Sequence, residues 1–378
     1  MQSKHFSILR WAGAVCMLLL ILLIMIEGTW AVKLYHTWIF ASLVLISSVL
    51  LAIACIRDLQ RKAWPLAFSH GGLLFVLIGA MAGALVKTDV KMVVDKHASE
   101  RVAYTAKNQP FVLPMAIQLE QFTIDYYDHS DKPKQFTSVI SIDGQHMLST
   151  SVNHPARYQG WWIYQSDYDH QQQDFVILQL TKDPWLPVVY IGFLLLVAGA
   201  VLQIVRVWHS WYVLLIALLI AAIFTAASLA RIELGTLVPA LRSLWFFPHI
   251  LIYMLAYSLL AIALVLAIGC LLNTRHQQRM SLLSVSLFTT ASSLLLIGML
   301  CGAVWAKDAW GDYWTWDAKE CWAAVTWLLS LMVMHLPLKK SNWGRMIVIL
   351  LTFAAMQMTW YGVNYLPSAQ FSVHTYNK

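Results

Sequence analysis

The sequence predicts an all-α polytopic membrane protein with about nine transmembrane helices and one small external domain rich in β-strands. Three observations lead to this class: charged residues are scarce, apolar segments of spanning length recur, and one polar stretch, residues 88–183, interrupts them. Of the 378 residues, 59% are hydrophobic and 12% are charged, whereas a soluble domain carries about 25% charged residues. Most of the chain therefore cannot face water.

Recurring apolar segments account for the helical part of this prediction. Each is roughly 17–25 residues long, enough for a helix to cross about 30 Å of hydrocarbon. The predicted spans are residues 11–29, 38–56, 67–87, 185–205, 212–230, 249–272, 282–304, 322–338 and 346–366. Lys4 and Arg10 precede the first apolar run as in a signal peptide, but the run is long and no small-residue cleavage site stands out. We therefore interpret it as a membrane anchor.

The distribution of charge over the loops predicts the orientation. With a cytoplasmic N-terminus, the inner loops carry one acid, Asp58, and the bases Arg57, Arg61, Lys62, Arg206, Arg275, Arg279, Lys339, Lys340 and Arg345. The outer loops carry the acids Glu233, Asp308, Asp312, Asp317 and Glu320. Because Lys and Arg favour the cytoplasmic side, we expect a bacterial inner-membrane protein whose C-terminus and residues 88–183 lie outside. The net charge of +7 then reflects these loops rather than nucleic-acid binding.

The polar stretch has the pattern of a β domain. Short apolar runs at 111–127, 135–152, 160–168 and 174–180 alternate with turn residues, and Asp143-Gly144 between two runs predicts a hairpin. The expected organisation is three N-terminal helices in 1–87, the external β-rich domain in 88–183, and a second transmembrane domain in 184–378. Five cysteines lie in or beside apolar spans without a CxxC or CxxCH motif, which argues against a disulfide framework, a cysteine metal site and a c-type cytochrome.

Two histidines are predicted at matched depth inside the membrane. His70 lies about one turn into the third span from its cytoplasmic end, and His335 about one turn into the eighth span from the same side. Gly71 and Gly72 lack side-chain bulk and would let a flat ligand approach beside His70. Either histidine could simply bond a backbone carbonyl or snorkel, but intramembrane histidine is costly. The matched depth favours a paired site.

A tryptophan-rich outer loop is predicted at residues 305–322. Six of the 18 tryptophans fall within 23 residues, where even scatter would place about one. They are Trp305, Trp310, Trp314, Trp316, Trp322 and Trp327. An aromatic belt explains one or two tryptophans at each span end, not four in one acidic loop. Flat indoles suit a large planar apolar ring, and Gly311 allows the backbone to approach such a ligand closely.

Two further histidines flank this loop in the sequence. His249 begins the sixth span after Pro248, and His374 follows the last span. Either could be an ordinary interfacial or tail histidine. Imidazole nitrogen is, however, a common axial ligand of haem iron. Two histidines beside an aromatic platform are the parts of a haem site, and we expect the ligand to be a transiently bound haem b.

Three segments resemble known families. "WGDYWTWDAKECW" (310–322) is similar to the tryptophan-rich signature of the haem-handling CcsA, CcmC and CcmF proteins, in its CcsA version. "VNHPARYQGWWIYQSDYD" (152–169) resembles the external domain of ResB-type proteins, and "FSHGGLLFVLIGA" (68–80) resembles their histidine-bearing span. Together the segments resemble a fused system II cytochrome c synthase of the CcsBA type, with its halves joined near residue 184.

The resemblance implies a role for each candidate residue. His249 and His374 would be the external axial ligands of the haem iron, and His70 and His335 an intramembrane pair that helps bring haem from the cytoplasmic side. The residues implied to contact haem in the loop are Trp310, Gly311, Trp314, Trp316 and Trp322. The implied reaction adds the two cysteine thiols of an apocytochrome c CxxCH motif to the haem vinyl groups, so the implied enzyme is a cytochrome c synthase of the haem lyase type.

Asp317 is a candidate catalytic residue in this scheme. Asp317 and Glu320 could steer haem propionates through Lys319 or assist proton delivery, or they could be solvated loop charges. The expected partners are haem, the apocytochrome, membrane lipid and a thioredoxin-like thiol reductant. Two other functions stay open: a haem exporter or chaperone that forms no covalent bond, and a dihaem b-type electron carrier. A cytochrome b normally places both ligands of each haem within facing helices, whereas the outer histidines here lie at span ends.

The predicted orientation is testable with topology reporters. A reporter active only outside the cytoplasm should work when fused after residue 378 or inserted near residue 130, because both positions are expected on the outer side. Strong activity of a cytoplasmic reporter at either position would overturn the orientation.

Overall fold

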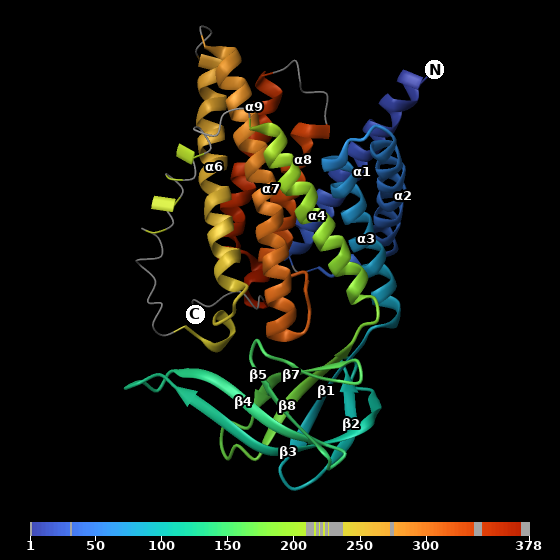
Figure 1. Ribbon diagram of the computed structural model, residues 1–378, viewed down its shortest axis with the longest axis vertical. Helices are drawn as coiled ribbons and strands as arrows, with labels where there is room; N and C mark the ends of the chain where they lie inside the picture. Colours follow the sequence, from blue (N-terminus) through green and yellow to red (C-terminus); the bar gives the residue numbers. More distant parts are fainter. Residues whose placement is uncertain are drawn as a thin grey trace.

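The computed structural model describes residues 2–30, 32–208, 237–272, 276–335 and 342–371, with a few positions between 215 and 226. A helical bundle occupies one end of the molecule and a single β-sheet the other (Figure 1). The helices are α1 (Gln2–Trp30), α2 (Trp38–Gln60), α3 (Trp64–Val86), α4 (Leu186–Val207), α6 (Phe246–Leu272), α7 (Gln277–Trp310), α8 (Ala318–His335) and α9 (Asn342–Trp360). The molecule is thus helical with one small antiparallel sheet, as predicted.

The predicted count of about nine helices is not confirmed. The described part of the chain contains eight α-helices, and the predicted span 212–230 lies almost entirely outside the described residues. Six of the described helices, α1 to α4, α6 and α7, are long and apolar enough to cross a membrane. Two others, α8 and α9, fall outside that group; α8 carries Lys319 and Glu320 in its first turn and His335 in its last. Multiple apolar helices nevertheless make this a multi-pass membrane protein.

The polar stretch between α3 and α4 folds into one eight-stranded antiparallel sheet with the order β5-β4-β3-β2-β1-β8-β7-β6. Its strands are β1 (Thr88–Asp95), β2 (Glu100–Thr105), β3 (Pro110–Tyr126), β4 (Pro133–Ile142), β5 (His146–Ser151), β6 (Ala156–Tyr158), β7 (Trp161–Tyr168) and β8 (Phe175–Lys182). The predicted hairpin at Asp143-Gly144 is confirmed, because Ile142 pairs with His146 across that turn and Gly144 has a positive φ of 68°. Alternate residues such as Val90, Met92 and Val94 are buried in the core of the sheet.

Pairing of the first and last strands places two helices side by side. β1 pairs with β8 in continuous register from Thr88–Lys182 to Asp95–Phe175. β1 follows directly on the end of α3, and α4 begins shortly after β8, so this pairing aligns the two helices. Their axes approach closely: a Cβ at Gly72 would lie 2.7 Å from the Leu196 nitrogen and 2.8 Å from the Gly192 oxygen. Only glycine fits at such a contact.

Several polar contacts join the sheet to the helical bundle. Asn153 Nδ2 donates to the Pro239 carbonyl at 2.8 Å, and Tyr127 Oη donates to the Leu237 carbonyl at 2.9 Å. At the end of α3, Lys87 pairs with Asp312 from the tryptophan-rich loop and with Asp89 of β1. Burial lowers the pKa of Lys87, but these two carboxylates outweigh that effect and raise it overall. The sheet is therefore docked on the loop end of the bundle.

The close contact between α3 and α4 predicts the effect of a single methyl group. Gly72→Ala should lower the thermal unfolding midpoint of the detergent-solubilised protein, because the new Cβ meets backbone atoms that cannot rotate away. Overpacking of this kind costs about 1–3 kcal/mol. Gly13→Ala is the matched control, since a Cβ there meets nothing within 4 Å and alanine favours the helix. Equal unfolding midpoints for the two variants would contradict the inferred contact.

Candidate functional site

The structure brings the two predicted inner histidines together. His70 lies in the second turn of α3 and His335 at the last residue of α8, and their ring centroids are 6.1 Å apart with an interplanar angle of 61°. The start of α3 and the end of α8 lie toward the end of the bundle remote from the sheet (Figure 1). The similar depth predicted from the sequence thus corresponds to a direct juxtaposition of side chains from the two halves of the chain.

Each of these imidazoles is oriented by an acceptor at Nδ1. His70 Nδ1 lies 2.7 Å from Oδ2 of Asp58, and His335 Nδ1 lies 2.9 Å from the Leu331 carbonyl one turn earlier. Neither a carboxylate nor a carbonyl can donate a proton, so Nδ1 carries the hydrogen in both rings. In the neutral tautomer this leaves the lone pair on Nε2, the nitrogen that a metal would use.

The spacing of the two rings fits a pair of axial ligands. Metal–imidazole bonds are about 2 Å long, so two rings on opposite faces of one iron have centroids roughly 6 Å apart. The observed 6.1 Å between His70 and His335 matches this separation. Histidine nitrogen is also a common axial ligand of haem iron. The separation of the two rings is therefore consistent with two imidazoles on one iron, and haem binding by His70 and His335 stays a prediction.

The glycines beside His70 serve a different purpose from the predicted one. We expected Gly71 and Gly72 to let a flat ligand approach α3. Instead, Gly72 packs against the α4 backbone, and a Cβ at Gly71 would lie 3.2 Å from Sγ of Cys55 in α2. Both glycines are buried. Their small size brings helices together and does not open a space next to the imidazole.

The predicted outer ligand His249 lies in the first turn of α6, at the end of the bundle that faces the sheet (Figure 1). Its Nδ1 lies 2.8 Å from the Gly298 carbonyl of α7, so this ring also carries its hydrogen on Nδ1. Gly302 makes room for the ring, since a Cβ there would lie 2.7 Å from two ring atoms. His374, the other predicted outer ligand, lies outside the described residues, so the pairing of these two histidines stays a prediction.

A series of aromatic contacts connects His249 to the end of α7. The His249 ring centroid lies 5.9 Å from Trp305, and Trp305 lies 5.3 Å from Trp310 in an edge-on arrangement. Trp305 Nε1 donates to the Ala240 carbonyl at 2.8 Å. His249 and the first part of the tryptophan-rich segment thus form one aromatic cluster, and the haem-binding role predicted for these residues stays a prediction.

The second part of the tryptophan-rich loop packs toward the N-terminal helices. Trp316 stacks on Tyr35 with centroids 5.4 Å apart and planes 10° apart, and it meets Phe40 edge-on. Trp314 lies 5.9 Å from Trp316 at 82°. The backbone of Trp316 is left-handed, with φ of 61°, a conformation that costs about 1–3 kcal/mol for such a residue. The contact with Tyr35, between α1 and α2, was not anticipated from the sequence.

Two buried indole groups in this region have unused donors. Among the described residues, Nε1 of Trp314 and Nε1 of Trp322 are buried without a hydrogen-bond partner. A buried donor left unpaired is costly and indicates a missing acceptor. Haem carries two propionate carboxylates, which accept hydrogen bonds from N–H groups. The indoles therefore fit a haem-sized ligand both as an apolar surface and as donors.

Gly311 lies against the sheet. It ends α7 in a left-handed conformation, φ 89°, and a Cβ there would lie 3.2 Å from the Tyr164 ring and 3.4 Å from Thr181. The neighbouring Lys307 is 2% exposed and donates to the Gly311 carbonyl at 2.7 Å. The observed close approach at Gly311 is thus to strands β7 and β8, whereas the predicted approach was to a ligand.

Asp317 and Glu320 form a capping box at the start of α8. Asp317 Oδ1 accepts from the Glu320 nitrogen at 2.9 Å, and Glu320 Oε2 accepts from the nitrogens of Thr315 at 2.6 Å and Asp317 at 3.4 Å. This reciprocal pattern satisfies the first N–H groups of a helix. The Asp-x-x-Glu spacing carries that signature in the sequence, where we considered only catalytic, steering and solvated roles. The catalytic role assigned to Asp317 stays a prediction.

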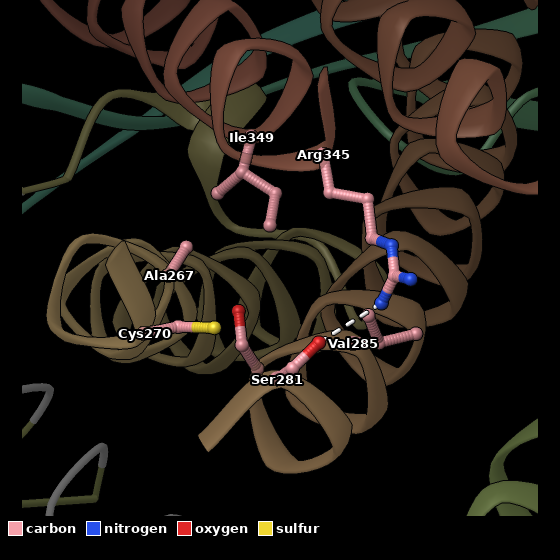
Figure 2. A pocket seen from close by; sticks show the side chains of 7 residues that line it. Ala267, Cys270, Ser281, Val285, Arg345 and Ile349 are labelled. Carbon is pink, nitrogen blue, oxygen red and sulfur yellow. Dashed lines mark hydrogen bonds between the residues drawn. The ribbon is translucent and has the colours of Figure 1, made fainter. Parts of the chain in front are cut away.

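Away from the histidines, a small pocket lies between α6, α7 and α9. Arg345 Nη1 donates to Ser281 Oγ at 2.9 Å beside Cys270 and Ile349 (Figure 2). The cavity of about 10 Å³ has room for one water molecule. A porphyrin cannot enter it. In the described part of the chain, no group of three or more His, Cys, Asp or Glu side chains could hold a bare metal ion.

Comparisons with known families match two separate parts of the chain. A model of the ResB-like family matches residues 57–174, and a model of the cytochrome C assembly proteins matches residues 185–369. The chain is similar to proteins named cytochrome c biogenesis protein CcsA. That of Chlamydomonas reinhardtii is 32% identical over 158 residues, covering 38% of this chain and 45% of the relative. That of Guillardia theta is 35% identical over 162 residues, covering 34% and 54%.

The chain spans about half the length of these curated relatives. The ResB-like match precedes the cytochrome C assembly match, which is the order of the corresponding motifs in the sequence, and the two matches meet between residues 174 and 185. One polypeptide thus joins a ResB-like domain to a cytochrome c assembly domain, and this fused ResB and CcsA architecture places the chain among the cytochrome c biogenesis proteins.

Proposed function

We propose that this protein binds haem b, carries it from the inner to the outer face of a bacterial cytoplasmic membrane, and attaches it to apocytochrome c. His70 and His335 bind it at the inner position, and His249 and His374 at the outer one. The observation that carries the proposal is the 6.1 Å separation of the His70 and His335 rings, which come from the ResB-like and the assembly parts of the chain. A separation of roughly 6 Å suits two imidazoles on one iron.

Support for the outer position comes from the aromatic cluster at the sheet end of the bundle. His249 is oriented by the Gly298 carbonyl and lies against Trp305. Trp314 and Trp322, in the tryptophan-rich loop, have buried indole Nε1 donors. A planar apolar ring with two carboxylates complements such a surface. In this scheme Trp310 and Trp316 belong to the same aromatic surface, and Gly311 sets its position by packing on the sheet.

The proposed reaction is an addition. Each thiol of the CxxCH motif adds across one vinyl double bond of the haem, so a carbon–sulfur bond forms while the thiol hydrogen moves to the other vinyl carbon. Atoms and electrons balance without an oxidant or reductant in this step. The thiols must be reduced beforehand, for which the proposal includes a thioredoxin-like partner. The substrate supplies both sulfur atoms, so the protein needs no cysteine nucleophile.

The protein's own contribution is to hold the reactants in one geometry. Fixing the porphyrin between two imidazoles and an aromatic surface prevents rotation, so each vinyl group is presented to its thiol in one orientation. Ordering of this type can lower the activation free energy by about 7–11 kcal/mol. The iron would bind the two imidazoles, and the histidine of the CxxCH motif would replace one of them when the substrate enters. The tryptophan side chains exclude water around the ring.

Co-expression with a CxxCH reporter in a host lacking its own maturation genes tests this function. Formation of a haem-stained band that survives denaturation supports a synthase, because only a covalent bond withstands that treatment. Haem delivered to the outside without a stained band would favour an exporter or chaperone. Stable haem in the protein and no effect on the reporter would favour a b-type electron carrier.

Histidine variants separate the two positions in the same assay. Replacing His249 and His374 together by Ala should abolish the outer bis-histidine spectrum. In the variants that lack only one of these histidines, added imidazole should partly restore haem loading, because the outer site is proposed to be accessible to water. Replacing His70 or His335 should lower haem content and reporter maturation, with weaker rescue inside packed helices. Soret absorbance per protein and stained reporter are measured for every variant. Normal maturation by a His70 or His335 variant at normal protein level would remove the inner pair from the proposal.

Asp317 can be tested for capping and catalysis separately. Asparagine caps a helix about as well as aspartate, whereas alanine costs about 1 kcal/mol. If capping of the Glu320 nitrogen is the whole role of Asp317, Asp317→Asn matures the reporter normally and Asp317→Ala loses protein stability. Reporter maturation is compared at equal protein level. Loss of maturation in Asp317→Asn with normal haem loading would instead assign a proton-transfer role to this carboxyl.

A further inference from the structure

Asp58 is a buried acid beside the inner histidine pair. It lies near the end of α2 and is 2% exposed. One carboxylate oxygen, Oδ2, lies 2.7 Å from His70 Nδ1, and the other, Oδ1, lies 3.2 Å from Arg57 Nη2. Each oxygen thus has a separate partner. Asp58 is also the only acid in the loops predicted to face the cytoplasm.

Burial of this carboxylate costs desolvation free energy that its interactions must offset. A buried charge in a membrane protein needs partners to offset its desolvation, and such residues usually mark a functional position. Arg57 supplies opposite charge, but its side chain is 26% exposed. Pairing with Arg57 alone would not require Oδ2 to point at the His70 ring. The 2.7 Å contact fixes the rotation of that ring and keeps its hydrogen on Nδ1.

We propose that Asp58 is a positioning residue for the inner haem ligand His70: it holds the imidazole with Nε2 toward the iron and increases its strength as a donor. This inference rests on the proposed function, since it assumes that His70 ligates haem. It assigns the two inner ligands different strengths. His70 donates to a carboxylate, whereas His335 donates to the neutral carbonyl of Leu331.

The physical consequence concerns the oxidation state of the bound iron. A carboxylate that accepts the Nδ1 hydrogen draws the proton away from the ring and makes Nε2 more electron-rich. An electron-rich axial ligand stabilises Fe(III) relative to Fe(II), because axial ligation is a main determinant of haem potential. Asp58 should therefore increase haem affinity at the inner position and lower its reduction potential.

The test uses the full-length chain in the His249→Ala background, which removes the proposed outer ligand. Haem content is measured by haemin titration of purified protein, and the reduction potential by redox titration of the Soret band. Asp58→Asn is the principal variant, since it keeps size and removes charge. Asp58→Glu is the conservative variant. Glu27→Gln is the matched control, because Glu27 is another buried acid, 4% exposed, whose carboxylate accepts from the Leu34 nitrogen.

Asp58→Asn should weaken haem binding about 10- to 100-fold, the usual cost of removing a partner of a metal-ligating histidine. It should also raise the Fe(II) to Fe(III) ratio at a fixed solution potential; a tenfold rise corresponds to about 59 mV for one electron. Asp58→Glu should recover most of both properties, and Glu27→Gln should change neither. If Asp58→Asn fails to accumulate because Arg57 has lost its ion pair with Asp58, the double variant Arg57→Gln, Asp58→Asn removes both charges and is judged by the same measurements.

The outcomes separate this inference from the proposed function. If haem in the His249→Ala background depends on His70 and His335 but Asp58→Asn leaves affinity and potential unchanged, Asp58 is only an ion-pair partner and the inference is overturned. A change in Asp58→Asn that is equally large in Glu27→Gln would also overturn it, as a general effect of removing buried charge. If the haem signal does not depend on His70 or His335, the inner site of the proposed function fails first.

Discussion

Pairing of β1 with β8 is the constraint on which the arrangement of both halves depends. This pairing sets the end of α3 beside the start of α4, and the two helices then pack closely through Gly72 and Gly192. α3 carries His70, and α4 begins the assembly domain. A sheet that lies at one end of the bundle thus helps to fix which helices meet at the other end, where His70 contacts His335.

Within the bundle, the three described candidate ligands are oriented in the same way. Each histidine presents Nδ1 to an acceptor: Asp58 for His70, the Leu331 carbonyl for His335 and the Gly298 carbonyl for His249. In an apolar environment an unsatisfied ring N–H is costly, so these bonds stabilise the fold whether or not a metal is bound. They also select one tautomer, with the lone pair on Nε2. Structural and ligating roles therefore use different nitrogens of the same ring.

The sequence was informative wherever one local rule dominated. Scarcity of charge and span length predicted the apolar helices, and Asp143-Gly144 predicted its hairpin. The depths of His70 and His335 predicted their proximity, because depth depends only on the distance along a helix from a charged end. The capping box of Asp317 and Glu320 is equally local, and its Asp-x-x-Glu spacing could have identified it, but we considered only other roles for these residues.

Tertiary contacts decided what the sequence left open. The sequence around Gly72 does not show whether this glycine faces a ligand or another helix. The pairing of β1 with β8 places α4 next to it. Strands β1, β2 and β6 were missed within the predicted β domain. β6 has three residues, too few for alternation to be recognised. The stacking of Tyr35 on Trp316 joins segments far apart in the chain, which no periodicity encodes.

The contacts of the tryptophan-rich loop indicate an advantage of having both domains in one polypeptide. Trp316 is held by Tyr35 from the N-terminal helices, and Gly311 by Tyr164 and Thr181 of the sheet. Lys87, at the end of α3, pairs with Asp312 of the loop. The loop belongs to the assembly domain, yet its described contacts come largely from residues that precede that domain. Linking two such partners in one chain replaces a bimolecular association by an intramolecular one with a high effective concentration. The loop conformation, including the left-handed Trp316, is therefore maintained without depending on the amount of a separate subunit in the membrane.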